Sequence, residues 1–190
     1  MNSPLLRKVA SLIFLYLASE PVAFAADLEL SIHFSKRTYK VGDGMEFQIE
    51  FRNTSDVPIK VIPEIDFFSS DLLSIRKTGG RAKVEYLRPD YERVMDLSAL
   101  SEYVVLLNPK DSLTRNYTVK VSSSLPKDYK DKSIGLFLVF PDSAIKLTGF
   151  GKYEARADYD SNDNMPGDPS IKLWRGKVLS RPVMLDFKGE

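Results

Sequence analysis

Apolar and polar residues alternate along much of this chain, a pattern that predicts β-strands rather than helices. In residues 28–34 every even position is apolar and every odd one is polar. The same two-residue period runs through residues 45–52. Such alternation is typical of a strand with one face buried and the other in water. It places the single histidine, His33, on the solvent face of the first strand.

Further strands follow along the chain. The alternation returns in residues 113–121, 153–159 and 178–187, and Pro182 within the last of these indicates an edge or a bulge. Residues 134–140 are apolar at successive positions, which predicts a central strand covered on both faces.

Two shorter segments, residues 72–76 and 82–87, flank Gly79-Gly80 and are predicted to pair as a hairpin. Seven or more short strands with no long segment of helical period predict an all-β fold, an antiparallel β-sandwich. Because no internal repeat of 20 to 50 residues is visible, one domain accounts for the strands.

The first 25 residues have the organisation of a secretory signal peptide. The basic pair Arg7-Lys8 precedes an apolar run, which is followed by Pro21 and the small-residue pattern of residues 23–25. The run is shorter than the roughly 20 residues that cross a bilayer core. We therefore expect a signal peptide over residues 1–25 and a single domain over residues 26–190.

Composition narrows the chemistry and the compartment. The chain has no cysteine and one histidine, which excludes disulfides, thiolate metal sites and multi-histidine metal sites. Its formal charge is +1, but residues 1–25 carry two basic residues and one acidic residue, so the remaining chain has 25 of each and is neutral. Neutrality argues against nucleic-acid and membrane-surface partners, and no later segment is long enough to span a membrane. Export without cysteine predicts a periplasmic or secreted protein of the bacterial envelope.

Three segments resemble immunoglobulin-like domains of exported bacterial proteins. The first is Tyr39-Lys40-Val41-Gly42-Asp43, followed by a strand and by Asn53-Thr54-Ser55-Asp56-Val57-Pro58-Ile59. The second is Leu107-Asn108-Pro109-Lys110-Asp111-Ser112, in which Lys110 stands where that group often has glycine. The third is Gly151-Lys152-Tyr153-Glu154-Ala155-Arg156-Ala157-Asp158-Tyr159. The resemblance implies an antiparallel immunoglobulin-like β-sandwich, in a group that includes inhibitor-type and adhesin-type domains. It assigns no functional residue.

The loop of residues 158–168 is a candidate calcium site. Asp158, Asp160, Asn162 and Asn164 have the every-second-residue spacing of the oxygen ligands in a calcium loop. The glycine and the bidentate glutamate that complete such a loop are absent from their positions. The alternative is a polar hairpin loop that binds no cofactor.

Three aromatic residues are candidate contact residues. Phe67 and Phe68 are adjacent in an expected loop, where they would either form an apolar binding patch or plug the end of the fold. Trp174 would stack on a sugar, lie in an interface, or pack against the core.

No catalytic motif is present in the sequence. The residues therefore favour a non-enzymatic exported domain that contacts a protein partner through end loops or an edge strand. The alternative is a carbohydrate-binding or hydrolytic envelope domain with a groove near Trp174 and the acids of residues 158–168.

Overall fold

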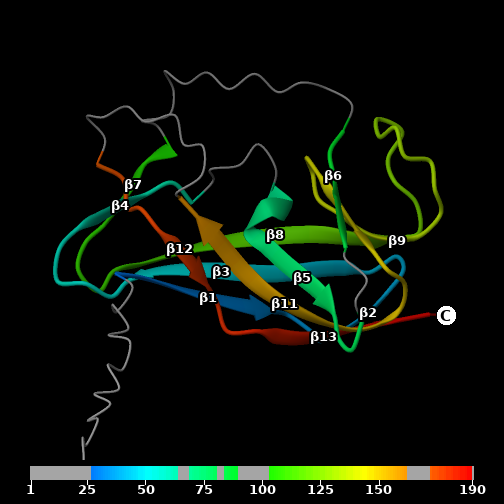
Figure 1. Cartoon of the computed structure of the whole chain (residues 1–190), viewed down its shortest axis with the longest axis horizontal. Helices are drawn as coiled ribbons and strands as arrows, with labels where there is room; N and C mark the ends of the chain where they lie inside the picture. The colour runs from blue at the N-terminus through cyan, green and yellow to red at the C-terminus, as the bar shows by residue number, and fades with distance from the viewer. Residues whose placement is uncertain (1–26, 64–68, 81–83, 90–102, 162–171, 190) are drawn as a thin grey trace, which may run out of the picture.

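The computed structural model describes residues 27–63, 69–80, 84–89, 103–161 and 172–189. The expected signal peptide lies outside this part of the chain. Within it are thirteen strands and one short 3-10 helix, η1 (Figure 1). Their bounds are β1 Leu28–Phe34, β2 Thr38–Lys40, β3 Gly44–Asn53, β4 Ile59–Val61, η1 Ser69–Leu72, β5 Leu73–Lys77, β6 Glu85–Leu87, β7 Val105–Leu107, β8 Ser112–Ser122, β9 Leu136–Val139, β10 Ala144–Leu147, β11 Gly151–Asp160, β12 Lys177–Leu179 and β13 Val183–Lys188.

The first sheet has the order β1-β3-β8-β9-β10-β6, with every neighbouring pair antiparallel. Burial alternates residue by residue along β1 and β3, as the sequence pattern predicts. His33 is exposed on the outer face. The sheet is therefore apolar toward the interior and polar toward water.

The second sheet curls around the long strand β11. One side of β11 pairs with β5, and the other side pairs first with β13 and then with β12. Strand β2 is parallel to β13, and all the other pairs are antiparallel. The short strands β4 and β7 form a separate two-stranded pair. The prediction of an all-β fold built from antiparallel sheets is confirmed.

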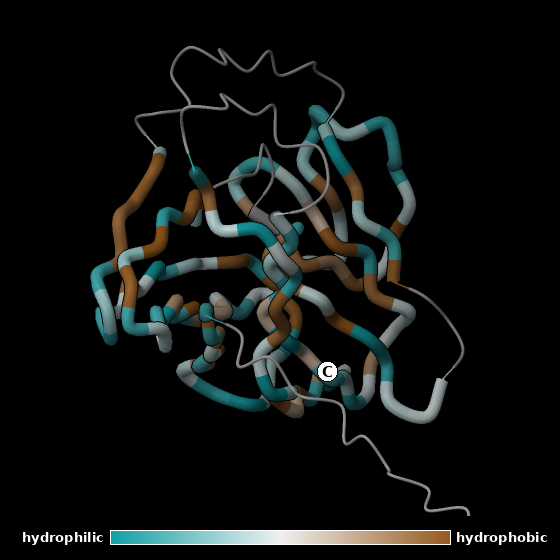
Figure 2. The backbone as a smooth tube through the Cα atoms, turned by 60° about the vertical axis from the view of Figure 1, so that its left-hand side comes forward, coloured by the Kyte–Doolittle hydropathy of each residue, from teal (hydrophilic) through white to brown (hydrophobic). Residues whose placement is uncertain are grey.

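The inner faces of the two sheets meet in one hydrophobic core. Figure 2 shows hydrophobic and hydrophilic positions alternating along the backbone of the strands. Phe51 of β3 packs edge-on against Tyr159 of β11, with ring centroids 5.4 Å apart. At the other end of β11, Tyr153 meets Phe187 in the same geometry at 5.5 Å. Edge-to-face aromatic pairs add attraction beyond the apolar area that they bury.

Two details of the predicted strands are wrong. The segments on either side of Gly79-Gly80 do not pair with each other, because β5 pairs with β11 and β6 pairs with β10. Gly79, with φ of +70°, lies where the chain crosses from one sheet to the other. The predicted central strand is confirmed for residues 136–139, which the structure covers on both faces, but Ile134 is 88% exposed in the loop before it.

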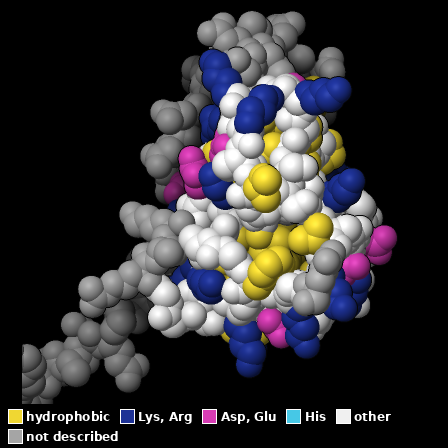
Figure 3. All heavy atoms as spheres, turned by 90° about the vertical axis from the view of Figure 1, so that its right-hand side faces the viewer, with side chains coloured by type: hydrophobic (Ala, Val, Ile, Leu, Met, Phe, Trp, Pro, Cys, Tyr) yellow, Lys and Arg dark blue, Asp and Glu magenta, His cyan; other side chains and the backbone are white. Residues whose placement is uncertain are grey.

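The two ends of the molecule differ in their connections. One end carries the loop of residues 123–135, the turn of residues 148–150 and the C-terminal end of β13 (Figure 1). Figure 3 looks at this end and shows hydrophobic side chains in the middle of the face with Lys and Arg side chains around them. The opposite end carries β4, β7 and the segment that leads into β12.

Replacing Phe51 tests how much the contact between the two sheets contributes to stability. Phe51 is completely buried, so we expect Phe51→Ala to lower the free energy of unfolding by about 3–5 kcal/mol through lost burial and the resulting cavity. Phe150→Ala is the control, because that side chain is 48% exposed, and its expected cost is about 0.5 kcal/mol or less. Urea denaturation measures both values, and equal costs would contradict this description of the core.

Candidate functional site

The candidate site is the outer edge of β12 and β13, the two short strands that continue one another along β11. Two buried serines hold these strands in place. Ser161 donates from its hydroxyl to the carbonyl of Trp174 at 2.9 Å and accepts from the N–H of Gly176 at 2.9 Å. A Cβ on Gly176 would lie 2.7 Å from the Trp174 ring, so this close approach requires glycine.

The second serine, Ser180, interrupts the strand. Its hydroxyl accepts the N–H of Ala157 at 2.9 Å and donates to the carbonyl of Arg181 at 3.0 Å. A side-chain oxygen thus takes the place of a backbone acceptor where residues 180–182 separate β12 from β13. The edge or bulge that Pro182 indicated lies at this position, where the register with β11 shifts by one residue between β12 and β13.

The register decides which backbone groups face outward on β12. Neighbouring residues of an antiparallel strand direct their N–H and C=O groups to opposite sides. Since the N–H of Ser180 donates to Ala157 at 2.9 Å, Val178 also faces β11. Lys177 and Leu179 therefore direct their backbone groups away from β11. Within the described residues, β12 pairs with β11 alone.

The same argument applies to the first half of β13. The N–H of Asp186 donates to the carbonyl of Arg37 at 2.8 Å, so Asp186 faces β2 and Met184 faces the same side. Strand β2 pairs only with residues 186–188. In the described part of the chain, the outward backbone groups of Met184 thus have no strand beside them.

Other edges of this sheet are occupied by side chains. On β5, the hydroxyl of Tyr86 donates to the carbonyl of Leu73 at 2.9 Å. On β2, the N–H of Lys40 donates to a carboxylate oxygen of Asp43 at 2.9 Å. Such contacts consume the groups that another strand would use. The outward positions of Lys177, Leu179 and Met184 show no equivalent contact among the described residues.

Exposed apolar side chains accompany this open edge. Leu179 is 45% exposed and Met184 is 48% exposed. Both belong to the outer face of the sheet, opposite Asp158 and Glu154 of β11. We call residues 177–184 the open edge. It offers unpaired backbone groups beside two apolar side chains.

The predicted calcium ligands Asp158 and Asp160 also lie on the outer face of β11. The ammonium group of Lys177 is 3.4 Å from a carboxylate oxygen of each. The charge of Asp158 is the main cause of a raised pKa for Lys177, which keeps this lysine positively charged. A cation therefore already lies between the two carboxylates.

The other two predicted calcium ligands follow β11 in the sequence. Asn162 and Asn164 lie outside the described residues. Within those residues no group of three or more acidic or histidine side chains could hold a metal ion. Calcium binding at residues 158–168 stays a prediction.

Trp174 packs against the core side of β11. Its indole is tilted over the ring of Tyr159 with centroids 5.9 Å apart. The backbone N–H of Trp174 donates to the carbonyl of Lys60 at 2.8 Å. Burial raises the pKa of Tyr159 to about 12, and the Ile62 N–H donates to its hydroxyl at 3.3 Å. Since the two aspartates lie on the opposite face, the structure does not bring Trp174 and these acids to one surface. Phe67 and Phe68 lie outside the described residues.

A serine and the single histidine are neighbours on the outer face of the first sheet. Ser31 Oγ lies 3.2 Å from His33 Nε2 and 3.3 Å from a carboxylate oxygen of Glu50. In a Ser-His-acid triad the acid orients the histidine, whereas here the carboxylate contacts the serine. The three residues are cross-strand or same-strand neighbours of β1 and β3 on a solvent-facing surface.

A second polar cluster joins the loop of residues 123–135 to β10. Lys146 Nζ lies 2.8 Å from Ser133 Oγ and 3.0 Å from Asp131 Oδ2. The backbone N–H of Ser133 is the largest cause that lowers the pKa of Asp131 to about 2, and the Ser133 hydroxyl and Lys146 add to it. The cluster ties the loop to the sheet.

This cluster predicts a change in acid stability. Because the pKa of Asp131 is lower in the folded protein than in the unfolded chain, its stabilising effect is present above pH 4 and is lost as the pH falls toward 2. We expect Asp131→Asn to lower the melting temperature at pH 6 and to flatten its dependence on pH between 4 and 2. Thermal melts across this range test the assignment, and parallel curves for the two proteins would contradict it.

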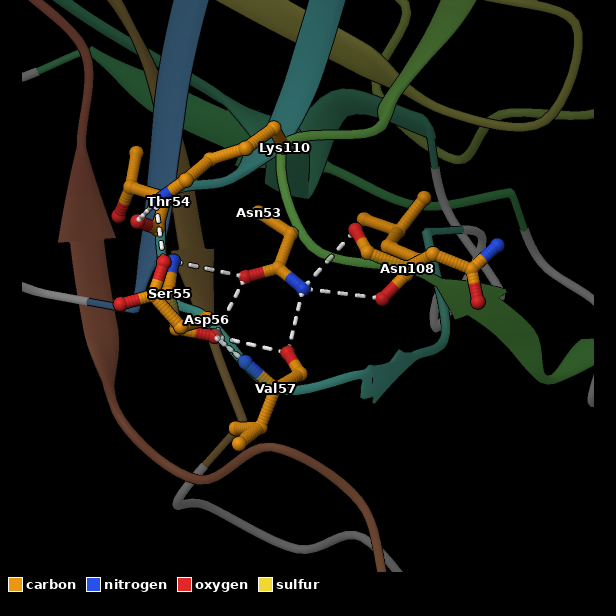
Figure 4. A network of polar contacts seen from close by, with 8 residues as sticks. Asn53, Thr54, Ser55, Asp56, Val57, Asn108 and Lys110 are labelled. Carbon is orange, nitrogen blue, oxygen red and sulfur yellow. Dashed lines mark hydrogen bonds and ion pairs between the residues drawn. The ribbon is translucent and has the colours of Figure 1, made fainter.

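Asn53 is a buried polar residue whose structural role the sequence did not indicate (Figure 4). Its side-chain amide donates to the carbonyls of Val57, Leu107 and Asn108 at 2.8–3.1 Å, and its carbonyl oxygen accepts from Ser55. It thereby joins the turn after β3 to the turn before β8. An asparagine at the end of an alternating strand is the signal in the sequence for this role.

Lys110 completes the same network. It has φ of +68°, the left-handed conformation that glycine adopts most readily, which explains why the resembling segments have glycine there. Its ammonium group donates to the carbonyl of Thr54 at 2.7 Å and lies 2.9 Å from Asp56.

Replacing Asn53 with its near-isosteric acid tests the network. In Asn53→Asp, a carboxylate oxygen would face three carbonyl oxygens in a buried position, and we expect a loss of about 3–5 kcal/mol at pH 7. Part of the loss should disappear near pH 4, because a protonated acid regains one donor. Asn116→Asp is the matched control, since Asn116 is exposed on β8 and its expected cost is within about 0.5 kcal/mol. Chemical denaturation measures both costs, and a small effect at Asn53 would overturn its assigned role.

Comparison with known proteins adds no family. No protein-family model matches the chain, and a search of curated proteins finds none with a similar sequence. Among the residues that the structure describes, no helix has the length and apolar character needed to cross a membrane.

Proposed function

We propose that this protein is an exported, non-enzymatic binding domain with an immunoglobulin-like β-sandwich fold. In this proposal a protein partner adds an extended segment to the open edge of residues 177–184. The observation that carries it is the pairing gap along β12 and β13, beside the exposed side chains of Leu179 and Met184. Export to the periplasm or the medium rests on the pattern of residues 1–25.

Strand order supports the immunoglobulin-like fold. In such domains strands A, B and E are neighbours in one sheet and C, F and G in the other. Here β1, β3 and β8 are neighbours, as are β5, β11 and β13. The first sheet continues with β9, β10 and β6, where an immunoglobulin domain has strand D.

A tyrosine near the start of β11 supports the same fold. The hydroxyl of Tyr153 donates to the carbonyl of Gly149, four residues earlier, at 2.6 Å. Immunoglobulin-like domains have such a tyrosine near the start of strand F. Ala155, two residues later, occupies the position where antibody domains have a disulfide cysteine. The buried inner faces replace that cross-link.

Strand addition suits the chemistry of the open edge. The backbone groups of an edge supply hydrogen bonds to an incoming strand, and neighbouring side chains select its sequence. Leu179 and Met184 would contact apolar side chains of the partner. The charged side chains of Lys177, Asp158 and Asp160 would disfavour a partner segment that places apolar residues next to them.

Photo-crosslinking in the producing cells tests the proposal. A crosslinking amino acid in place of Met184 should give a discrete adduct with a partner protein, whereas the same group in place of Val57, which is 60% exposed, should not. Leu179→Pro removes an outward N–H without removing a bond to β11, so it should lower the yield at position 184 about fivefold or more.

Leu179→Lys is a second variant, because lysine on an edge strand opposes pairing without altering the backbone. Thermal melts show whether each variant retains the fold. A yield at position 184 that neither variant changes would show that the partner does not add a strand. Equal adducts from positions 184 and 57 would overturn the site itself.

A further inference from the structure

The loop of residues 123–135 holds an isoleucine in water. Ile134 is 88% exposed, the largest exposed fraction among the large apolar side chains of the described residues. The sequence pattern placed it in a buried strand. Burying such a side chain is favourable, so a binding partner that covers Ile134 gains free energy.

The loop fixes Ile134 through contacts on both sides of it. Ser133 donates its N–H to Asp131 at 2.7 Å, and Lys146 binds both residues from β10. On the other side, the N–H of Gly135 donates to the carbonyl of Ser123 at 3.1 Å. The exposed position is thus part of an ordered loop.

Phe150 adds a second apolar group at the same end. The β9–β10 ladder ends where Leu136 faces Leu147, so the segments that carry Ile134 and Phe150 leave the sheet side by side. Phe150 is 48% exposed, and its ring lies 3.6 Å from the position of a Cβ on Gly189.

Basic residues surround these apolar groups. Exposed cationic side chains at this end are Arg37, Lys40, Lys120, Lys127 and Lys152, and Lys188 is also exposed but lies beside Asp186. The acidic residues Asp43, Asp131 and Asp186 each lie within 4.0 Å of a lysine, which offsets their charge, and Asp128 is exposed in the loop next to Lys127. Figure 3 shows Lys and Arg side chains around the hydrophobic centre of this face, with acidic side chains among them.

We propose that this end of the molecule binds the surface of an anionic membrane. Ile134 and Phe150 would enter the boundary between headgroups and acyl chains, and the surrounding lysines and arginine would contact lipid phosphates. Peripheral proteins bind membranes through this combination of buried apolar area and attraction to anionic lipids. A nucleic acid would use the charge but would leave Ile134 exposed, so the lipid surface fits both observations.

This site lies at the opposite end from the start of the open edge, so it does not rest on the proposed protein contact. Strand addition at residues 177–184 would leave residues 123–135 free. The two proposals can therefore fail separately.

Vesicle sedimentation tests the proposal with the protein in the form recovered from cells. We expect binding to vesicles of phosphatidylcholine with about one third phosphatidylglycerol, weaker binding at high salt, and little binding to phosphatidylcholine alone. Ile134→Ser should weaken binding about tenfold, and Lys127→Glu about fivefold or more. All variants share one N-terminus, so any contribution from its apolar run is equal and the differences report the loop.

Two matched variants at the opposite end are controls. Leu106 is 52% exposed on β7 and Lys60 is exposed on β4, and Leu106→Ser and Lys60→Glu should leave vesicle binding unchanged. Thermal melts confirm that each variant is folded. The proposal is overturned if anionic vesicles are not bound, or if Ile134→Ser and Leu106→Ser have equal effects. Binding to a DNA duplex that is as tight as binding to vesicles, and insensitive to Ile134→Ser, would also overturn it.

Discussion

Burial of the inner face of β11 is the constraint on which the rest of this fold depends. The inward side chains are two tyrosines at the ends and two alanines between them, all at most 1% exposed. The small alanines leave room for the side chains of the facing sheet, and each tyrosine finds a polar partner for its hydroxyl at an end of the strand. Because β11 pairs on both sides, it also fixes the positions of β5, β12 and β13. With no cysteine in the chain, this packing is not reinforced by a cross-link.

The same strand explains why one edge is open. A long strand needs a partner along its whole length, and here two short strands supply it, separated by residues 180–182. Ser180 satisfies the backbone at the break with its hydroxyl, so the break leaves no buried donor unpaired there. Strand β2 reaches only the second half of β13. The outward groups of β12 and of Met184 are therefore a place where another strand can pair, whereas Tyr86 and Asp43 each occupy one backbone group on the other edges of the same sheet.

Charge is distributed unevenly over a chain whose totals balance. Lysines of β2, β8, β11, β13 and the loop of residues 123–135 lie at one end of the molecule, although these segments are far apart in the sequence. The attraction of a surface for an anion depends on this local arrangement rather than on net charge. The neutral total of the sequence argued against nucleic-acid and membrane-surface partners, but a total carries no information about the charge of one face. Because an isoleucine is exposed within that face, a ligand bound there would contact an apolar side chain as well as positive charge.

The sequence by itself determined the class of fold, because a two-residue period can bury only one face of a strand and so specifies sheets packed through apolar faces. It identified β1, β3, β8 and β11 and placed His33 outside. It also predicted an edge or a bulge near Pro182, because proline cannot donate to a ladder. Only the tertiary structure decided which strands pair, since register and partner depend on contacts between distant segments. That is why the hairpin expected around Gly79-Gly80 became a crossover between sheets. For the same reason Ile134, which belongs to an apolar run, lies in water. Lys177 lies between Asp158 and Asp160, and Asn53 binds Leu107, which is 54 residues away in the sequence.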